Sequence, residues 1–248
     1  MVSLPFFKLD EKRLWQAIGI VLGVSLVLIF AAVQSSWWTA SFYPDNTQEA
    51  RGEFSFDGRD LQLYRNGEEA ACPLVVCGER PYTDGSALGT VMDRTEMFVT
   101  LGLIGLVIYV GMLLGLYHGK LHNTRLVLGT GFASLAALLV GLFWFTFTVG
   151  EAGVQEVERV FDAYAAQSGG VPRPEPKFWG TQDIAGNELE TAPGLGWLFA
   201  ILGALNLALG TVLLYHFPEE SDDTAGYAVE EETAETSSPG RLAASRDG

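Results

Sequence analysis

The stretch "LWQAIGIVLGVSLVLIFAAVQSSWW" (residues 14–38) decides the fold. It contains no Asp, Glu, Lys or Arg, and its apolar run has about the 20 residues that a helix needs to cross roughly 30 Å of hydrocarbon. Lys8, Lys12 and Arg13 precede it, as in a secretory signal peptide. Because the run is about twice as long as the hydrophobic region of such a peptide, we interpret it as a retained membrane anchor.

Three later stretches also lack charged residues, and each contains an apolar core of similar length. A helix that is apolar on every face belongs either in lipid or inside a much larger protein. The sequence therefore predicts an all-α membrane protein, a four-transmembrane-helix bundle with a small antiparallel β-sheet in its first extracytoplasmic loop. We place the four spans at residues 15–36, 97–117, 126–148 and 195–216.

The charges lie outside these spans and predict their orientation. The chain has 248 residues and a net charge of −15, yet its N-terminus (1–14) and the short connection at 118–125 are net positive. Basic residues near a membrane favour its cytoplasmic side. We therefore expect a multi-pass protein of the plasma (cytoplasmic) membrane with both termini in the cytoplasm. The acidic segments 37–96 and 149–194 would then lie outside.

The first outer loop has the pattern of a folded β-meander. Asp57-Gly58 and Asn66-Gly67 are residue pairs that tolerate the positive φ angles of tight hairpin turns. Between them, apolar and polar residues alternate, which gives each predicted strand one apolar face. A further strand can begin directly after the first span, at residues 35–43.

The second outer loop begins as a continuation of the third span. Apolar residues recur there at helical spacing, which predicts an amphipathic helix that runs outward until Gly169-Gly170. Its apolar stripe either packs on the sheet or binds a partner; the residues are Val154, Val157, Val160, Phe161 and Tyr164. The tail at 217–248 is rich in acids and poor in large apolar residues, which predicts disorder and a role in solubility or in docking a basic partner.

Two cysteines, Cys72 and Cys77, lie in the first outer loop, in the oxidising compartment. Thiol oxidoreductases usually activate a Cys-x-x-Cys pair, whereas this spacing is longer and the chain has no second pair. Two thiolates do not fill a tetrahedral zinc site. The pattern therefore favours a structural disulfide, and a membrane thiol oxidoreductase is the less favoured alternative.

The spans carry hydroxyl and amide groups where a proton- or ion-coupled carrier usually has a charged group. Hydrogen bonding between helices accounts for all of these groups: Gln16, Ser25, Gln34, Ser134, Thr146, Thr148 and Asn206. The sequence also lacks catalytic motifs, so we expect no enzyme activity, no cofactor, no metal and no nucleic-acid partner.

Small residues repeat along single helix faces, and such faces let helix backbones approach closely in lipid. They can pack within the bundle or between subunits, and the sequence does not separate the two. The residues are Gly19 and Gly23, Gly111 and Gly115, and Ala200, Ala204 and Ala208.

This layout resembles the claudin and peripheral-myelin-protein superfamily of four-span proteins. That family has a tryptophan soon after its first span, a Leu-Trp pair before the first cysteine of the loop, and an arginine before its second span. Here Trp37 or Trp38 matches the first, Leu63-Tyr64 is the closest counterpart of the second, and Arg94 matches the third. The cysteine spacing is shorter than in the family, and Tyr64 stands where it has Trp.

The resemblance implies a non-catalytic protein whose outer sheet mediates lateral assembly, adhesion, paracellular pore formation or regulation of a partner channel. It implies a homo-oligomer or a complex with another membrane protein. Trp37, Trp38, Tyr64 and Arg94 are then expected to orient the sheet at the membrane surface. The alternative is an accessory subunit of a larger membrane transporter or respiratory complex.

Overall fold

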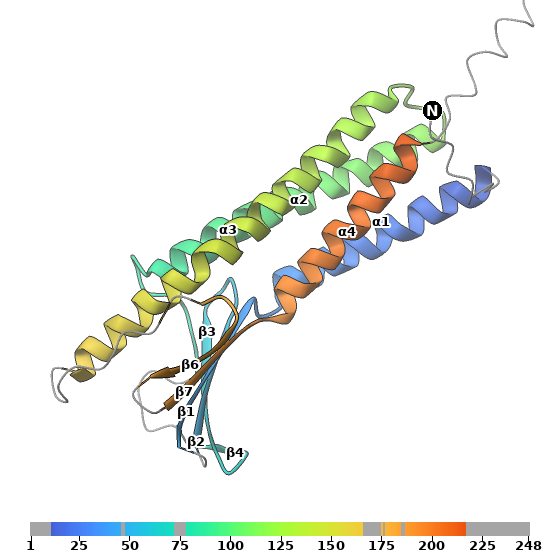
Figure 1. Ribbon diagram of the computed structural model, residues 1–248. Coiled ribbons are helices and arrows are strands. Elements are labelled where there is room, and N and C mark those ends of the chain that lie inside the picture. The colour runs from blue at the N-terminus through green and yellow to red at the C-terminus, as the bar shows by residue number, and fades with distance from the viewer. Residues whose placement is uncertain are drawn as a thin grey trace, which may run out of the picture. The chain divides into compact units, whose positions relative to one another are not determined.

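The computed structural model describes residues 11–45, 48–71, 78–165, 175, 177–184 and 187–216. Figure 1 shows the helices with a β-sheet at one end of them. The helices are α1 (Glu11–Gln34), α2 (Ala87–Tyr117), α3 (Thr124–Ala165) and α4 (Leu195–Tyr215). The strands are β1 (Trp38–Asp45), β2 (Gln48–Phe54), β3 (Arg59–Arg65), β4 (Glu68–Ala70), β5 (Gly78–Arg80), β6 (Gly180–Ile184) and β7 (Asn187–Pro193).

All four predicted helices are present, and each is long and apolar enough to cross a membrane. Their bounds differ from the predicted spans mainly at α2, which begins ten residues before the predicted span. Ser86 caps this helix, because its side chain accepts a hydrogen bond from the Gly89 backbone N–H (3.1 Å). The helix of the third predicted span continues beyond residue 148, since α3 runs to Ala165; its predicted end at Gly169-Gly170 lies outside the described residues.

The helices approach one another at glycines, where serines add hydrogen bonds. Between α2 and α3, the Ser134 hydroxyl donates to the Gly102 carbonyl (2.6 Å). Between α1 and α4, the Ser25 hydroxyl donates to the Gly203 carbonyl (2.7 Å). Hydrogen bonding between helices, predicted for the polar groups of the spans, is thus confirmed for these two serines. Asn206 instead donates to Leu202 of its own helix (2.8 Å), so for this residue the prediction was wrong.

The helix faces that carry small residues differ in whether another part of the chain packs on them. Ala200 and Ala204 of α4 are buried within the chain. A Cβ atom added to Gly19 or Gly23 of α1, or to Gly111 of α2, would meet nothing within 4 Å. The small residues of α4 therefore serve packing within the chain, whereas those three glycines leave open space.

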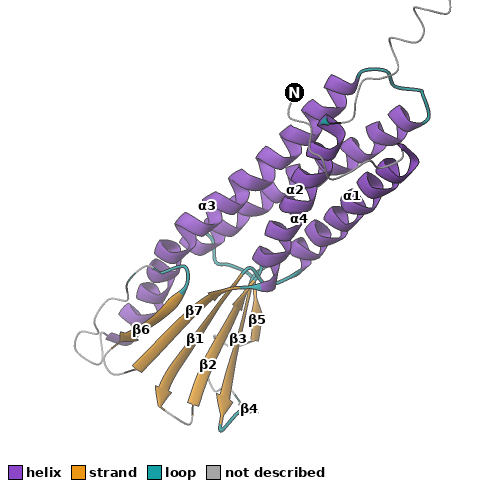
Figure 2. Cartoon of the chain, turned by 45° about the vertical axis from the view of Figure 1, so that its right-hand side comes forward, coloured by secondary structure: helices purple, strands orange, loops and turns teal. Residues whose placement is uncertain are grey.

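The strands form one antiparallel sheet in the order β4-β3-β2-β1-β7-β6, with β5 also paired to β3 (Figure 2). The prediction assigned this sheet to the first outer loop alone. That prediction was incomplete, because the second outer segment supplies the β6–β7 hairpin, and β7 pairs with β1 from Trp38↔Pro193 to Tyr43↔Glu188. Both of the segments predicted to lie outside therefore contribute to one sheet, with β1 near its middle.

The two predicted turns have different physical causes. Asn66 and Gly67 both have positive φ angles (54° and 81°), which confirms the predicted tight turn. Gly58 is needed for another reason: a Cβ atom there would collide with the carbonyl oxygen of Arg80, which lies against it. Close approach of β5 therefore explains this glycine.

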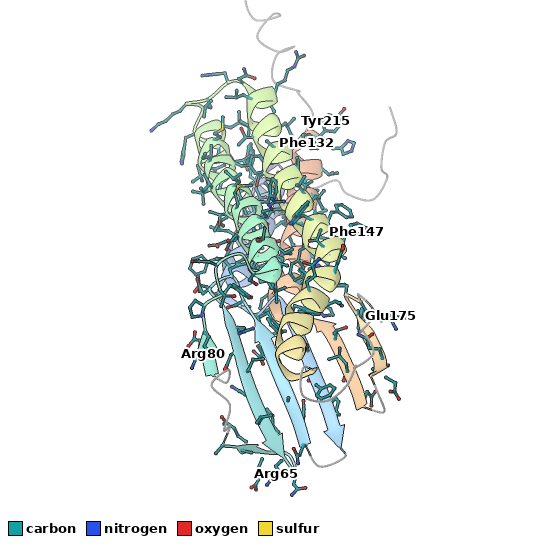
Figure 3. All side chains as sticks on the ribbon, turned by 90° about the vertical axis from the view of Figure 1, so that its left-hand side faces the viewer. Arg65, Arg80, Phe132, Phe147, Glu175 and Tyr215 are labelled. Atoms are coloured by element: carbon teal, nitrogen blue, oxygen red, sulfur yellow. The ribbon has the colours of Figure 1, made fainter. Side chains whose placement is uncertain are left out.

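Large apolar side chains cover the outward faces of the helices. Phe132 and Phe147 project outward from α3 and are 51% and 78% exposed (Figure 3). Exposed apolar side chains also recur along α1, α2 and α4. Contiguous apolar surface of this kind is rare on soluble proteins, so the four helices are compatible with a multi-pass membrane protein.

We expect Gly102→Ala to destabilise the protein by about 1–3 kcal/mol, because the added carbon would lie 2.5 Å from Leu138 Cγ and overpack the α2–α3 contact. Thermal unfolding in mild detergent measures the change. Gly111→Ala is the matched control in the same helix, where the added methyl group has open space. Equal melting temperatures for the two variants would contradict the close α2–α3 contact.

Candidate functional site

The helix–sheet junction is organised around Trp37, whose side chain is fully buried. Its indole N–H donates to the carbonyl of Ala32 (2.8 Å), near the end of α1. Its backbone N–H donates to Phe54 (2.7 Å), and its carbonyl accepts from Gly194 (2.9 Å). One residue therefore ties the end of α1 to β2 and to the start of α4.

Trp38 begins β1 and joins the sheet to α3. Its indole N–H donates to the Phe178 carbonyl (3.2 Å), and its ring centroid lies 5.2 Å from that of Phe54. A Cβ atom on Gly153 would lie 2.5 Å from the Trp38 ring. The part of α3 beyond the predicted span thus packs on the sheet at this tryptophan.

Aromatic rings extend this junction from Trp37 to α3 and α4. The Trp37 ring lies 4.7 Å from Phe56 and 5.3 Å from Phe145, between ring centroids. Phe178 then lies 5.9 Å from Phe145 and 5.3 Å from Trp197. Such edge-on and tilted pairs stabilise a core beyond their buried area alone. The aromatic contacts fix where the sheet sits on the helices.

The structure separates the other two candidate interface residues from this junction. The Arg94 guanidinium of α2 lies over the ring of Trp144 of α3, 5.1 Å from its centroid, a cation–π contact. Tyr64 of β3 pairs with Glu49 and Glu69. The end of β3 near the junction is marked by Arg59, because its partner Phe54 also pairs with Trp38, and Tyr64 lies towards the opposite end of the strand. Trp37 and Trp38 are therefore together, whereas Arg94 and Tyr64 are each elsewhere.

The predicted cysteine pair, Cys72 and Cys77, lies outside the described residues. The strands that flank this segment are described, and both pair with the same edge of β3. Ala70 of β4 lies opposite Leu63, and Gly78 of β5 lies opposite Leu61. The chain therefore leaves the β3 edge and returns to it at positions two residues apart.

The strand registers divide the sheet into two faces: an apolar face, which holds the large apolar side chains together with Arg59, Arg65 and Arg80, and an acidic face. Side chains alternate between faces along each strand, and directly paired residues share a face. The apolar face includes Trp38 and Phe54, and it faces α3 through the Trp38–Gly153 contact. The other face, which we name the acidic face, carries eight carboxylates: Glu49, Glu53, Asp60, Glu69, Glu79, Asp183, Glu188 and Glu190.

Arg51 is the single basic side chain among the described strand residues of the acidic face. It lies 3.7 Å from the Glu53 carboxylate in an exposed ion pair. Glu49 accepts hydrogen bonds from Ser41 (3.0 Å) and Tyr43 (3.4 Å). Burial, and then the negative charge of Glu49, raise the pKa of the Tyr43 hydroxyl above its usual range. The face therefore keeps a strong excess of negative charge at neutral pH.

The carboxylates of the acidic face are spread over several strands and do not converge on one point. Within the described part of the chain, no group of three His, Cys, Asp or Glu side chains is close enough to hold a metal ion. A distributed charge of this kind suits a partner with several cationic groups better than a single ion.

Sequence reasoning missed the acidic residues that come from β6 and β7. The sequence pattern that predicts a strand here is short: Glu188 and Glu190 alternate with Leu189 and Thr191 over only four residues. This alternation matches a two-faced strand, but the partner strand lies about 150 residues away in the chain.

No protein-family model matches the chain, and a search of curated proteins finds no relative. Any functional assignment therefore depends on the helices and the two-faced sheet described above.

We expect Trp37→Ala to destabilise the protein by about 3–5 kcal/mol, because it opens a cavity at the helix–sheet junction and removes the bond to Ala32. Chemical unfolding in detergent, together with proteolysis of the outer segments, measures the loss. Trp179→Ala is the control, because Trp179 is 72% exposed and should lose little stability. A Trp37 variant as stable and protease-resistant as this control would contradict the anchoring role.

The disulfide between Cys72 and Cys77 stays a prediction, and thiol alkylation followed by mass spectrometry tests it. We expect two alkyl groups to add only after reduction. Replacing both cysteines with serine should cost roughly 2 kcal/mol or less, because the closed loop is short and the pairing of β4 and β5 with β3 already holds its two ends. Alkylation of both thiols without reductant would rule the bridge out.

Proposed function

We propose that this chain is a non-catalytic integral membrane protein that acts as an interaction platform. Its outer sheet presents the acidic face to a partner with a basic surface. The observation that carries the proposal is the division of the sheet into two faces. One face packs towards α3. The other carries eight carboxylates and one basic side chain, Arg51, among its described strand residues.

Membrane insertion and orientation are part of this proposal. The exposed apolar side chains of the four helices support insertion, because contact with lipid avoids the cost of holding this surface in water. Basic residues near the α2–α3 connection, Lys120 and Arg125, support a cytoplasmic location for that end. The sheet at the opposite end of the helices then lies outside the cell membrane (Figure 1).

A claudin-like role fits this arrangement as an expectation. Three residues separate the end of α1 from the start of the sheet, and the Trp38 ring packs on Gly153 of α3, so the position of the sheet on the helices is fixed. A surface held in this way is suited to lateral assembly or partner regulation, because little conformational freedom is lost on binding.

The charge of the acidic face favours a foreign partner over a second copy at this surface. Two copies that met through their acidic faces would bring like charges together, which opposes association. A basic protein surface reverses the sign of that interaction. This favours a complex with another protein, including the accessory-subunit arrangement, for contacts made through the sheet.

Binding of a lysine-rich peptide to the protein in lipid nanodiscs tests the proposal. We expect wild-type affinity to fall as salt is added, because the charges are exposed and screened. Neutralising four exposed carboxylates, with Glu53→Gln, Asp183→Asn, Glu188→Gln and Glu190→Gln, should weaken binding roughly tenfold, at a few tenths of a kcal/mol for each charge.

A matched control removes the same amount of charge from the tail, with Glu219→Gln, Glu220→Gln, Asp222→Asn and Asp223→Asn. This control should bind the peptide nearly as well as wild type. If both variants lose affinity equally, only net charge matters, and the proposed docking surface is wrong. A soluble, lipid-free protein would overturn the membrane part of the proposal separately.

A further inference from the structure

An apolar groove of about 230 Å³ lies between α1 and α2, at the end where α1 begins and α2 ends. Both helices contribute to its walls. The apolar lining residues are Ile18 and Leu22 of α1 and Val110, Leu113 and Leu114 of α2. Ile18, Leu22 and Leu113 are buried at its base, whereas Leu114 is 57% exposed, so the groove opens outward from the helices.

Gly19 keeps this groove open. It lines the groove, and a Cβ atom built on it would meet nothing within 4 Å. Gly23, one turn further along α1, also has open space but does not line the groove. The two glycines therefore differ in one relevant respect, which is their access to the groove.

The mouth of the groove combines a cation with two aromatic rings. Lys12 is the charged residue among those that line it, and its side chain is exposed. Trp15 and Tyr117 also line it, with ring centroids 5.6 Å apart at an interplanar angle of 65°. Tryptophan and tyrosine favour the level of lipid headgroups, where one end of the ring is apolar and the other is wet.

We propose that this groove binds an anionic phospholipid, with one acyl chain along the apolar walls and the phosphate at Lys12. The inference rests on the membrane placement proposed above but not on the acidic face. The apolar walls match an acyl chain, and Lys12 matches a phosphate in charge. Further positive charge at the same end of the helices, from Arg13, Lys120 and Arg125, adds to this complementarity.

The charge at the mouth separates this occupant from a second copy of the chain. An apolar helix from another copy could cover the walls, but the charge-free stretches at 15–36, 97–117, 126–148 and 195–216 carry no acid to meet Lys12. A phospholipid supplies both the apolar chain and the negative charge. Phosphatidylglycerol is therefore the probe that fits, and phosphatidylcholine, with its neutral headgroup, is the lipid against which selectivity is measured.

Native mass spectrometry of the detergent-purified full chain, titrated with each lipid, tests the proposal. We expect wild type to bind phosphatidylglycerol more tightly than phosphatidylcholine. Gly19→Leu should weaken binding of phosphatidylglycerol at least about fivefold, because the new side chain occupies the groove. Gly23→Leu adds the same side chain on the same helix, one turn away, and should bind like wild type.

Lys12→Gln separates the headgroup from the acyl chain. This variant should lose about fivefold in affinity for phosphatidylglycerol, as expected for one lysine near an anionic lipid, and keep its affinity for phosphatidylcholine. Equal binding of the two lipids by wild type would overturn the anionic specificity. Equal loss in Gly19→Leu and Gly23→Leu, or no loss in either, would overturn the groove as the site. Unchanged melting temperatures confirm that each variant is folded.

Discussion

The hydrogen bond from the Trp37 indole to the Ala32 carbonyl is the constraint on which the arrangement of the outer sheet depends. A fully buried indole needs an acceptor for its N–H, and the last turn of a helix has carbonyls without partners in the helix. The bond places the ring against α4, where Gly196 allows it to approach, because a Cβ atom there would lie 2.6 Å from the ring. The helix end and the start of the sheet are therefore fixed together, and β1 can act as a template for strands from both outer segments.

Once β1 is fixed, the strand registers determine the chemistry of each face. Strands on either side of β1 place their side chains in phase with it, so acids that lie far apart in the sequence, such as Glu53 and Glu190, reach one surface. The apolar side chains are directed to the other face, where Trp38 packs on Gly153 of α3. A shift of one residue in either pairing would exchange these faces, so burial of the apolar side chains stabilises the acidic surface indirectly.

Much of this fold could be predicted because lipid-spanning helices and tight turns have strong local patterns. The four helices, the long extension of α3 and the Asn66-Gly67 turn all follow from such patterns. The start of α2 could not be predicted, because Asp93, Arg94 and Glu96 interrupt the apolar run while the cap that begins the helix is the single side chain of Ser86. The β6–β7 hairpin could not be predicted either, because its stability comes from pairing with β1 and its own residues include few apolar ones.

The acidic face shows why a candidate functional surface can be hard to recognise in a sequence. Glutamates that alternate with apolar residues are ordinary on the solvent side of a strand, and each hairpin taken alone carries only a few of them. Their meaning changes when both outer segments join one sheet, because exposed charges within about a Debye length of one another act as a single field. The helix ends opposite the sheet carry Lys12, Arg13, Lys120 and Arg125, so basic residues lie beside the apolar stretches there, while the tail that follows α4 in the sequence is acidic. Under the two proposals above, these basic residues favour one orientation in a membrane, and the two ends would take different partners: a basic surface at the sheet and anionic lipid at the groove.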